Sequence, residues 1–371
     1  MSAESDRHPF QRQHAVAEPD DTRFRPKIIG GMLALESTAA VTQTPPPFAA
    51  NRSLLLATAR GAVRLLCDIL RPPRVWLPSY LCDVVIAPIA ESGCDVVFYR
   101  IDAELRADDP DTLGDVGPGD IVVFIDYFGF SECESVGALA RARGAWVVED
   151  ACQALFKTAM SHTADYALMS PRKFLGVPDG GILLARAGVP FVSDHLPGAD
   201  TTWWLKAFDA SRRRAMFDIA GGERDWFRAY QEVEASAPSA PCRMSELSRL
   251  ILDCCVPWTH VARQRRENYA VLAAELGEFA WRDTLPDGCV PVGFPLRVAN
   301  RDDVRSHLFA HDIFPPVHWP LHQVPAEFND SHVVSAQLMT LPCDQRYDTE
   351  DMRRMAASFR LAEPRPITRQ L

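Results

Sequence analysis

Lys173 is the residue of this sequence that could most readily do covalent chemistry, because turn-forming residues frame it on both sides. Ser170 and Pro171 precede it, and Pro-Asp-Gly-Gly follows at residues 178–181. An ordinary lysine has a pKa of about 10.4 and is a poor nucleophile, but burial or Schiff-base formation changes this. The alternative interpretation is an ordinary surface lysine.

Glu149 and Asp150 end an apolar segment earlier in the chain. Residues 145–151 predict a buried strand, and the carboxyl ends of parallel strands point into the crevice where open sheets bind ligands. Because side chains alternate along a strand, only one of the two carboxylates faces a given side. One carboxylate and one lysine are the minimum for holding pyridoxal 5'-phosphate (PLP), with the lysine as a Schiff base and the carboxylate at the pyridinium nitrogen.

The segments around these residues alternate between helical and strand patterns. The predicted helices are residues 52–70, 83–93 and 135–144, and the predicted strands are 74–80, 94–102, 120–129 and 145–151. Near-continuous apolar strands separated by helices indicate an α/β fold, with a mainly parallel sheet and helices on both faces.

The pattern changes after residue 186. Predicted elements there are an aromatic-rich helical segment at 201–237, a long helix at 243–277 interrupted by Pro257, a strand at 290–298, and helices at 301–312 and 348–361. We therefore expect a large domain over residues 27–250 and a smaller α+β domain over 251–371. Residues 1–26 carry charges of both signs and no apolar core, which predicts a flexible tail and no signal peptide.

The bulk composition is that of a globular chain of 371 residues, 47% of them hydrophobic, with a net charge of -10. No apolar run approaches the roughly 18 residues that cross a bilayer, and the negative charge argues against binding to polyanions. The ten cysteines have no metal-binding spacing, so we expect reduced thiols in the cytoplasm. We predict neither a nucleic-acid partner nor membrane association.

Several motifs occur in a characteristic order along the chain. They are EDACQA at 149–154, ADYALMSPRK at 164–173, DGG at 179–181, DIFPPVHWPLH at 312–322 and LPCDQRYDTEDMRRM at 341–355. This order resembles the DegT/StrS-type PLP-dependent aminotransferases, best known for nucleotide-sugar aminotransferases, over residues 27–360. The resemblance implies a divergent member with fold type I, a large domain on a mainly parallel seven-stranded sheet, a smaller C-terminal α+β domain, and a homodimer.

The resemblance also implies roles for individual residues. Lys173 would form the Schiff base with the cofactor as an internal aldimine and shuttle the proton. Asp150 would pair with the pyridine nitrogen, and Gln153 would contact the ring hydroxyl. Ser170 would donate to the phosphate, although only two residues separate it from Lys173, fewer than is usual in the family.

Phosphate binding would also use residues 57–62, because backbone N–H groups at a helix start suit an anion. Either Thr58 or the pair Arg60 and Gly61 occupies the family's phosphate position, and the second register is preferred because it places Val63 at an apolar position. Arg60 would then add positive charge, the alternative being a helix-surface arginine.

Two further positions depart from the family pattern. Cys82 stands where an aromatic residue usually covers the cofactor ring, so either Tyr80 leans in or the Cys82 sulfur packs on the ring, unless both belong to the core. Pro241 replaces an asparagine that in many members reaches the phosphate of the neighbouring subunit.

His318 and Trp319 lie in the family-like HWPLH segment and are predicted to line the substrate entrance, the alternative being a purely structural turn. His318 and His322 are four residues apart, but Pro320 argues against the helix that would bring both to a metal ion. We therefore predict no metal site.

The predicted function is transfer of an amino group from an amino acid donor such as glutamate to a keto sugar, cyclitol or other secondary-metabolite ketone. Elimination or dehydration on the same cofactor is an alternative, less favoured because related sugar dehydratases typically carry histidine in place of the lysine. Other carbanion chemistry, such as decarboxylation or carbon-carbon bond formation, belongs to the same alternative because the cofactor supplies the electron sink for all of it. A catalytically silent partner or sensor protein is the second alternative. Retention of Lys173, Asp150 and Gln153 counts against it.

Overall fold

The computed structural model describes residues 27–367 except 40, 43, 108, 110, 131–132 and 193–195. The predicted tail at residues 1–26 lies outside the described residues. Among the helices that are described, none combines the length and the apolar character needed to cross a membrane.

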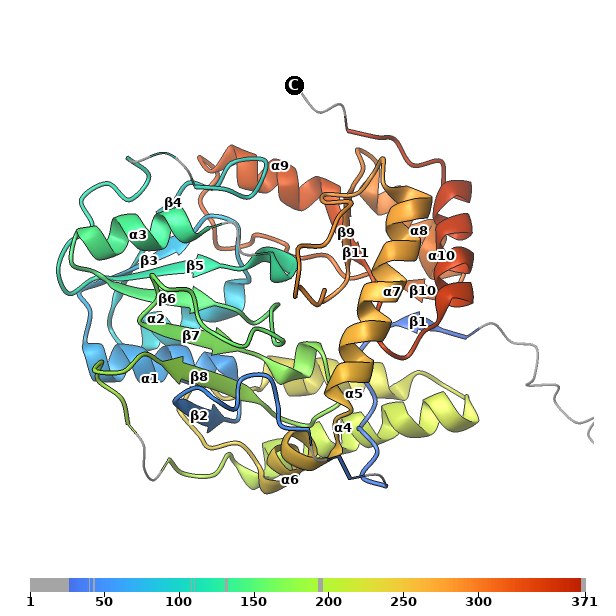
Figure 1. Ribbon diagram of the computed structural model, residues 1–371. Helices are drawn as coiled ribbons and strands as arrows, with labels where there is room; N and C mark the ends of the chain where they lie inside the picture. The colour runs from blue at the N-terminus through green and yellow to red at the C-terminus, as the bar shows by residue number, and fades with distance from the viewer. Residues whose placement is uncertain are drawn as a thin grey trace, which may run out of the picture.

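A seven-stranded sheet forms the centre of the larger part of the molecule (Figure 1). Its strands are β2 (Ser53–Leu56), β3 (Arg74–Pro78), β4 (Asp95–Tyr99), β5 (Ile121–Ile125), β6 (Trp146–Asp150), β7 (Tyr166–Met169) and β8 (Gly181–Ala185). The order is β2-β8-β7-β6-β5-β3-β4, parallel from β7 to β4, with β8 antiparallel to both of its neighbours. The prediction of a mainly parallel seven-stranded sheet is confirmed.

Helices cover both faces of this sheet, as its apolar strands require. Side chains alternate along β5, so that Val123 and Ile125 face α1 and α2 whereas Phe124 faces Gly137 of α3. The helices are α1 (Ala59–Leu70), α2 (Ile86–Glu91) and α3 (Glu134–Ala142).

The predicted helix at residues 52–70 is wrong in its first third. Residues Ser53–Leu56 form β2, which pairs antiparallel with β8, and Thr58 then caps α1 by accepting a hydrogen bond from the Gly61 N–H at 3.0 Å. An apolar run of this length fits a strand or a helix equally well, and its pairing partner lies far along the chain.

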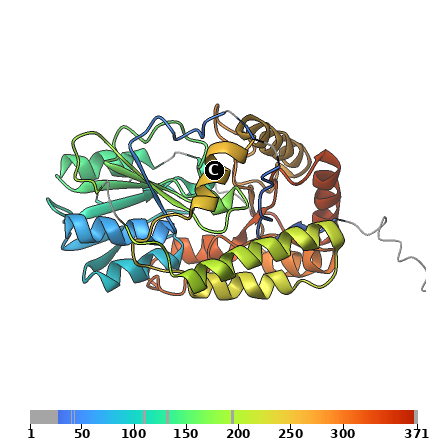
Figure 2. The ribbon, with the colours of Figure 1, turned by 90° about the horizontal axis from the view of Figure 1, so that it is seen from below.

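The second half of the chain contributes a helical hairpin and a smaller α/β unit. Its helices are α4 (Thr201–Ala220), α5 (Asp225–Ala235), α6 (Glu246–Leu250), α7 (Trp258–Leu276), α8 (Arg301–Ala310), α9 (Asn329–Gln337) and α10 (Thr349–Leu361), and its strands are β9 (Phe294–Arg297), β10 (Ile313–Phe314) and β11 (Leu338–Leu341). Figure 2 shows α4 and α5 side by side, reaching from the sheet towards the C-terminal helices.

One strand from the start of the chain belongs with this smaller unit. β1 (Ile29–Gly30) pairs in parallel with β10, so the first described residues lie against the C-terminal part of the fold (Figure 1). A strand from the predicted large domain thus pairs with a strand from the predicted smaller domain. The domain boundary at residue 250 stays a prediction.

Candidate active site

The candidate site forms where β6 and β7 end. These strands are neighbours and parallel, with Asp150 opposite Leu168, so their carboxyl ends meet at one edge of the sheet. β6 ends at Asp150, and β7 leads through Ser170 into a single 3₁₀ turn, Pro171–Lys173. The structure therefore brings the predicted carboxylate and the predicted lysine to the same edge.

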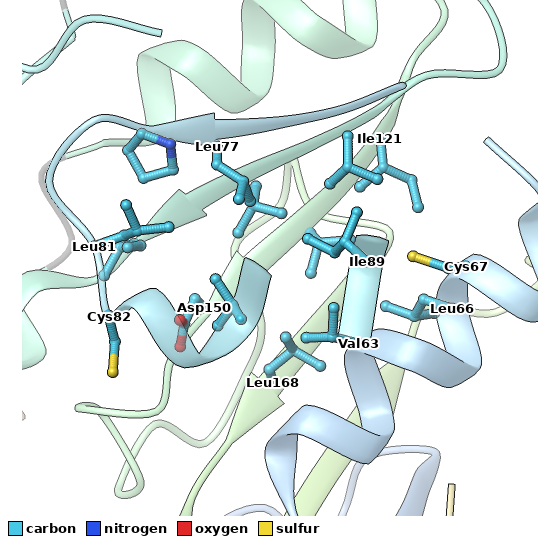
Figure 3. A pocket seen from close by; sticks show the side chains of 16 residues that line it. Val63, Leu66, Cys67, Leu77, Leu81, Cys82, Ile89, Ile121, Asp150 and Leu168 are labelled. Atoms are coloured by element: carbon cyan, nitrogen blue, oxygen red, sulfur yellow. The ribbon is translucent and has the colours of Figure 1, made fainter. Parts of the chain in front are cut away.

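Asp150 and Glu149 have separate surroundings, as strand alternation predicts. Asp150 lines a narrow cavity of about 20 Å³ whose other lining side chains carry no charge, and Figure 3 shows it beside Cys82. Its Oδ1 accepts a hydrogen bond from the Cys152 N–H at 2.9 Å. Glu149 is fully buried, pairs with Lys157 and accepts from the Ser161 N–H at 2.7 Å.

Cys82 lies close to both Asp150 and Lys173. Burial raises the pKa of the Cys82 thiol, the charge of Lys173 opposes this rise, and the charge of Asp150 adds to it. Tyr80, the other candidate for the ring position, is fully buried and donates its hydroxyl to the His318 carbonyl. The structure thus brings Cys82 to the site and leaves Tyr80 in the supporting layer, packed on Trp319 at 5.6 Å.

Gln153 is 1% exposed, and only the oxygen of its side-chain amide forms a hydrogen bond among the described residues. Its Oε1 accepts from the Phe128 N–H at 2.8 Å, whereas its Nε2 is buried without a hydrogen-bond partner among the described residues. That hydrogen bond holds Phe128 at φ 58°, a left-handed conformation that is costly for a residue with a side chain. An unpaired buried donor also carries a cost, unless a ligand accepts from it.

Lys173 and His318 line a larger open cavity of about 510 Å³. The Lys173 Nζ lies 5.8 Å from the centre of the Trp319 ring, and the His318 Nδ1 lies 2.9 Å from the Thr340 Oγ1. Burial and the nearby charge of Lys173 lower the pKa of His318 to about 3. His318 is therefore a neutral wall of the cavity at ordinary pH, and Lys173 provides the positive charge next to it.

The same cavity is unusually rich in arginine. Its lining includes Arg172, Arg224, Arg265, Arg305 and Arg346, with Asp344 as the acidic residue among them. Arg346 pairs with Asp344 at 2.8 Å, but neither Arg224 nor Arg305 forms an ion pair within the described chain. Burial lowers the pKa of both these guanidinium groups, and a neighbouring arginine lowers each further. An arginine nevertheless stays charged near neutral pH. Each of the two is therefore a cation without an ion-pair partner among the described residues.

The start of α1 carries the predicted phosphate-binding residues. The Thr58 Oγ1 caps the helix at the Gly61 N–H and donates to the Pro238 carbonyl at 3.0 Å. The Arg60 side chain is only 16% exposed, because its Nη2 lies 3.2 Å from the Oε2 of Glu234. Arg60 is thus drawn into the structure by a carboxylate of the same chain.

Ser170 lines a cavity that this carboxylate also lines. The cavity is smaller, about 150 Å³, and its lining includes Arg172, Lys173, Tyr230 and Glu234. Arg172 forms an ion pair with Glu234, and burial raises the pKa of Tyr230 to about 12. The structure places Ser170 and Lys173 at one cavity, and the acidic side chain of Glu234 lines the same cavity.

Three comparisons with known proteins bear on this arrangement. No protein-family model and no curated protein sequence matches the chain. Solved structures do match: the aminotransferase TlmJ from Streptoalloteichus hindustanus is 17% identical, with a TM-score of 0.63 over 91% of this chain and 99% of its own. The putative sugar aminotransferase Spr1654 from Streptococcus pneumoniae, in its PLP form, is 15% identical, with a TM-score of 0.63 over 90% of this chain and 98% of its own.

A DegT DnrJ EryC1 StrS aminotransferase from Brucella abortus is 14% identical, with a TM-score of 0.55 over 84% of this chain and 86% of its own. The chain has the sugar-aminotransferase fold. The fold-type I architecture that the motif order predicts is thereby confirmed.

The residues that the sugar-aminotransferase fold presents here fit the pyridoxal end of PLP. Gln153 offers a buried N–H that has no partner among the described residues, Asp150 offers a carboxylate among apolar side chains, and Lys173 offers an amine at the same sheet edge. The phosphate end has suitable donors in Arg60 and Arg172. Both arginines already form ion pairs with the carboxylate of Glu234.

Several residues of the site are not named individually among the predictions from sequence, although the aromatic and arginine content of residues 195–240 suggests a pocket for an anionic or ring-bearing substrate. The residues not named are Arg172, Arg224, Tyr230, Glu234 and Arg305. Arg172 carried a signal, because it is one of the two residues in the shortened interval between Ser170 and Lys173. Nothing in the sequence around Glu234 distinguishes it from the other acidic residues of α5.

Proposed function

We propose that this chain is a PLP-dependent aminotransferase that moves an amino group from an amino acid, glutamate being the expected donor, to a ketone on a sugar, a cyclitol or another secondary metabolite. The observation that carries the proposal is the meeting of Lys173, Asp150 and the unused amide N–H of Gln153 at one sheet edge. The fold supports it, since the chain shares it with the aminotransferase TlmJ and the putative sugar aminotransferase Spr1654.

Each of these residues has a role that its surroundings support. When bound, PLP supplies an electron sink for the carbon that loses or gains a proton. Lys173 would hold the cofactor through its Nζ and could carry the proton at that atom. Asp150 would pair with the pyridine nitrogen, and the Gln153 Nε2 would donate to the ring hydroxyl. His318, with a pKa of about 3, stays neutral and does not compete with Lys173 as the base.

The cavity next to Lys173 favours an acidic amino acceptor. Arg224 and Arg305 line it without ion-pair partners in the described chain, and each lies over an aromatic ring, Phe314 for Arg224 and Phe309 for Arg305. These two rings stack on each other at 5.3 Å. A phosphate or carboxylate group on the acceptor would provide the missing negative charge.

The test is the visible absorbance of the purified protein with PLP, compared between wild type and Lys173→Ala. We expect wild type to show the yellow band of lysine-bound PLP and to lose it when glutamate is added, as pyridoxamine phosphate forms. Lys173→Ala should show neither the band nor turnover. Lys206→Ala, which removes an exposed lysine on α4, is the matched control and should behave as wild type. A Lys173→Ala protein with unchanged band and turnover would contradict the proposal.

A homodimer in the cytoplasm is part of the same proposal. Large apolar side chains are exposed on α4, among them Ile219 at 81% and Met216 at 50%, as on a surface that a second subunit covers. The cysteines of the chain are free thiols, which suits a reducing compartment. Light scattering should give twice the chain mass of 41.3 kDa.

A further inference from the structure

The first turn of α1 is already in contact with an anion that the chain itself supplies. The last turns of α5 bring Glu234 there, and its carboxylate pairs with Arg60 at 3.2 Å and with Arg172. Both Arg60 terminal nitrogens also donate to the Glu234 backbone carbonyl at 3.3 Å. Two guanidinium groups beside a helix N-terminus are the arrangement that proteins use for phosphate groups.

The charges show that Glu234 is an anion in this position. Burial by itself raises the pKa of Glu234, but Arg172, Arg60 and Lys173 together bring it below its ordinary value. Arg172 responds in the opposite direction: burial lowers its pKa, but Glu234, Tyr230 and Asp179 together raise it above its ordinary value. The Glu234 carboxylate therefore neutralises one of the two guanidinium charges, and an added dianion would compete with it for both arginines.

Adjacent backbone of the same chain covers the rest of the helix start. The Pro238 carbonyl accepts from the Thr58 hydroxyl, and the Ala57 N–H donates to the Cys242 carbonyl at 2.8 Å. A Cβ added to Gly61 would lie 3.1 Å from the Ala240 oxygen. This segment, residues 236–242, follows directly after α5 and is therefore continuous with the helix that carries Glu234.

We propose that Glu234 is a built-in anion that competes with the phosphate group of a bound ligand for Arg60 and Arg172. The inference rests on the proposed function in taking PLP as that ligand. A phosphate dianion that contacts both guanidinium groups would lie close to the Glu234 carboxylate, and the two negative charges would repel each other. The site therefore holds the phosphate of PLP less tightly than its two arginines alone would, and the pyridoxal ring is held independently of Glu234.

Replacing Glu234 by glutamine removes the charge and keeps the size of the side chain. We expect the dissociation constant of PLP, from the growth of its absorbance band, to fall about tenfold in Glu234→Gln. Pyridoxal, which has the ring without the phosphate, should bind wild type and variant equally. Glu232→Gln is the matched control on the same helix, because Glu232 is exposed and pairs with Arg228. Unchanged or weaker PLP binding in Glu234→Gln would overturn the inference.

Inorganic phosphate separates this inference from the proposed function. In calorimetric titration we expect phosphate to bind Glu234→Gln about tenfold more tightly than wild type, and the added change Arg172→Gln to abolish the gain. If PLP gives no band with any variant, the proposed function fails while the phosphate titration still decides the inference. If Glu234→Gln does not fold, Glu234→Asp replaces it, because the shorter side chain moves the carboxylate away from the arginines. Phosphate binding to that variant that is no tighter than to wild type would overturn the inference.

Discussion

Arg224 is a cation whose partners are aromatic rings. Its guanidinium lies 3.7 Å from the centre of the Phe314 ring and 5.5 Å from that of Trp226, and its Nε is buried without a hydrogen-bond partner among the described residues. Cation–π contacts of this kind stabilise the charge but leave its hydrogen-bonding capacity open. An incoming anion would use that capacity.

We expect Arg224→Gln to weaken the binding of an acidic ligand about tenfold, because one charge-assisted contact is lost. Calorimetric titration of the PLP-loaded protein with inorganic pyrophosphate measures this. Arg228→Gln is the control, since Arg228 lies on α5, which begins directly after Arg224, and pairs with Glu232 on the exposed surface. Equal pyrophosphate affinity in Arg224→Gln and wild type would contradict an acidic acceptor in this cavity.

His318 should make the stability of the protein fall as the pH is lowered. Its pKa is about 3 in the folded protein and about 6.5 in an unfolded chain, so between these values the unfolded state binds more protons. The free energy of unfolding then decreases by up to about 1.4 kcal/mol per pH unit over this window as pH falls. Urea denaturation at pH 7, 6 and 5 should show a shallower decline in His318→Gln, whereas His260→Gln, an exposed histidine on α7, should keep the wild-type slope.

At the scale of single residues, the sequence predicted what local spacing encodes. Lys173 and Asp150 follow from strand ends and turns, and the structure brings them together. The sequence did not predict that Arg172 meets Glu234, because that ion pair joins the 3₁₀ turn after β7 to α5. The sequence also left Tyr80 and Cys82 as alternatives for the residue that contacts the cofactor ring. Which of the two side chains reaches the site depends on how the chain turns after β3.

At the scale of elements, the structure departs most from the sequence around β2 and α1. Leu54, Leu55 and Leu56 satisfy a helical pattern as readily as a strand pattern. They form a strand because β8 offers an open edge, and Gly181 permits the close approach, since a Cβ there would lie 2.3 Å from the Thr58 backbone. The later helices were predictable because their periodicity is local, whereas the pairing of β2 with β8 is not.

Thr58 is the residue on which this strand-to-helix junction depends. Its Oγ1 caps α1 at Gly61 and donates to Pro238, so Thr58→Ala should lower the free energy of unfolding by about 1–2 kcal/mol. Thr58→Ser keeps the hydroxyl and should recover most of this loss in urea denaturation. If serine destabilises as much as alanine, packing of the Thr58 methyl group and not the cap holds the junction.

At the scale of the whole molecule, the sheet and the C-terminal unit share one core. Trp281 packs on Phe128 at 5.5 Å and on Phe130 at 5.4 Å, and residues of both parts belong to one continuous apolar cluster. The chain also closes on itself, since Ile29 of β1 pairs with Ile313 of β10. The sequence predicted two domains from a change of pattern, and patterns carry no information on how far their cores merge.

Substitution of Ile29 tests whether the pairing of β1 with β10 stabilises the whole molecule or only the C-terminal unit. The side chain is fully buried, so Ile29→Ala should cost about 2–5 kcal/mol of unfolding free energy. If the core acts as one unit, urea unfolding followed by far-UV circular dichroism and by tryptophan fluorescence should shift together, because tryptophans lie in both parts. Val41→Ala, at a side chain that is 77% exposed, is the control and should change stability by less than about 0.5 kcal/mol. Two separate transitions, of which Ile29→Ala moves only one, would show that the C-terminal unit unfolds independently of the sheet.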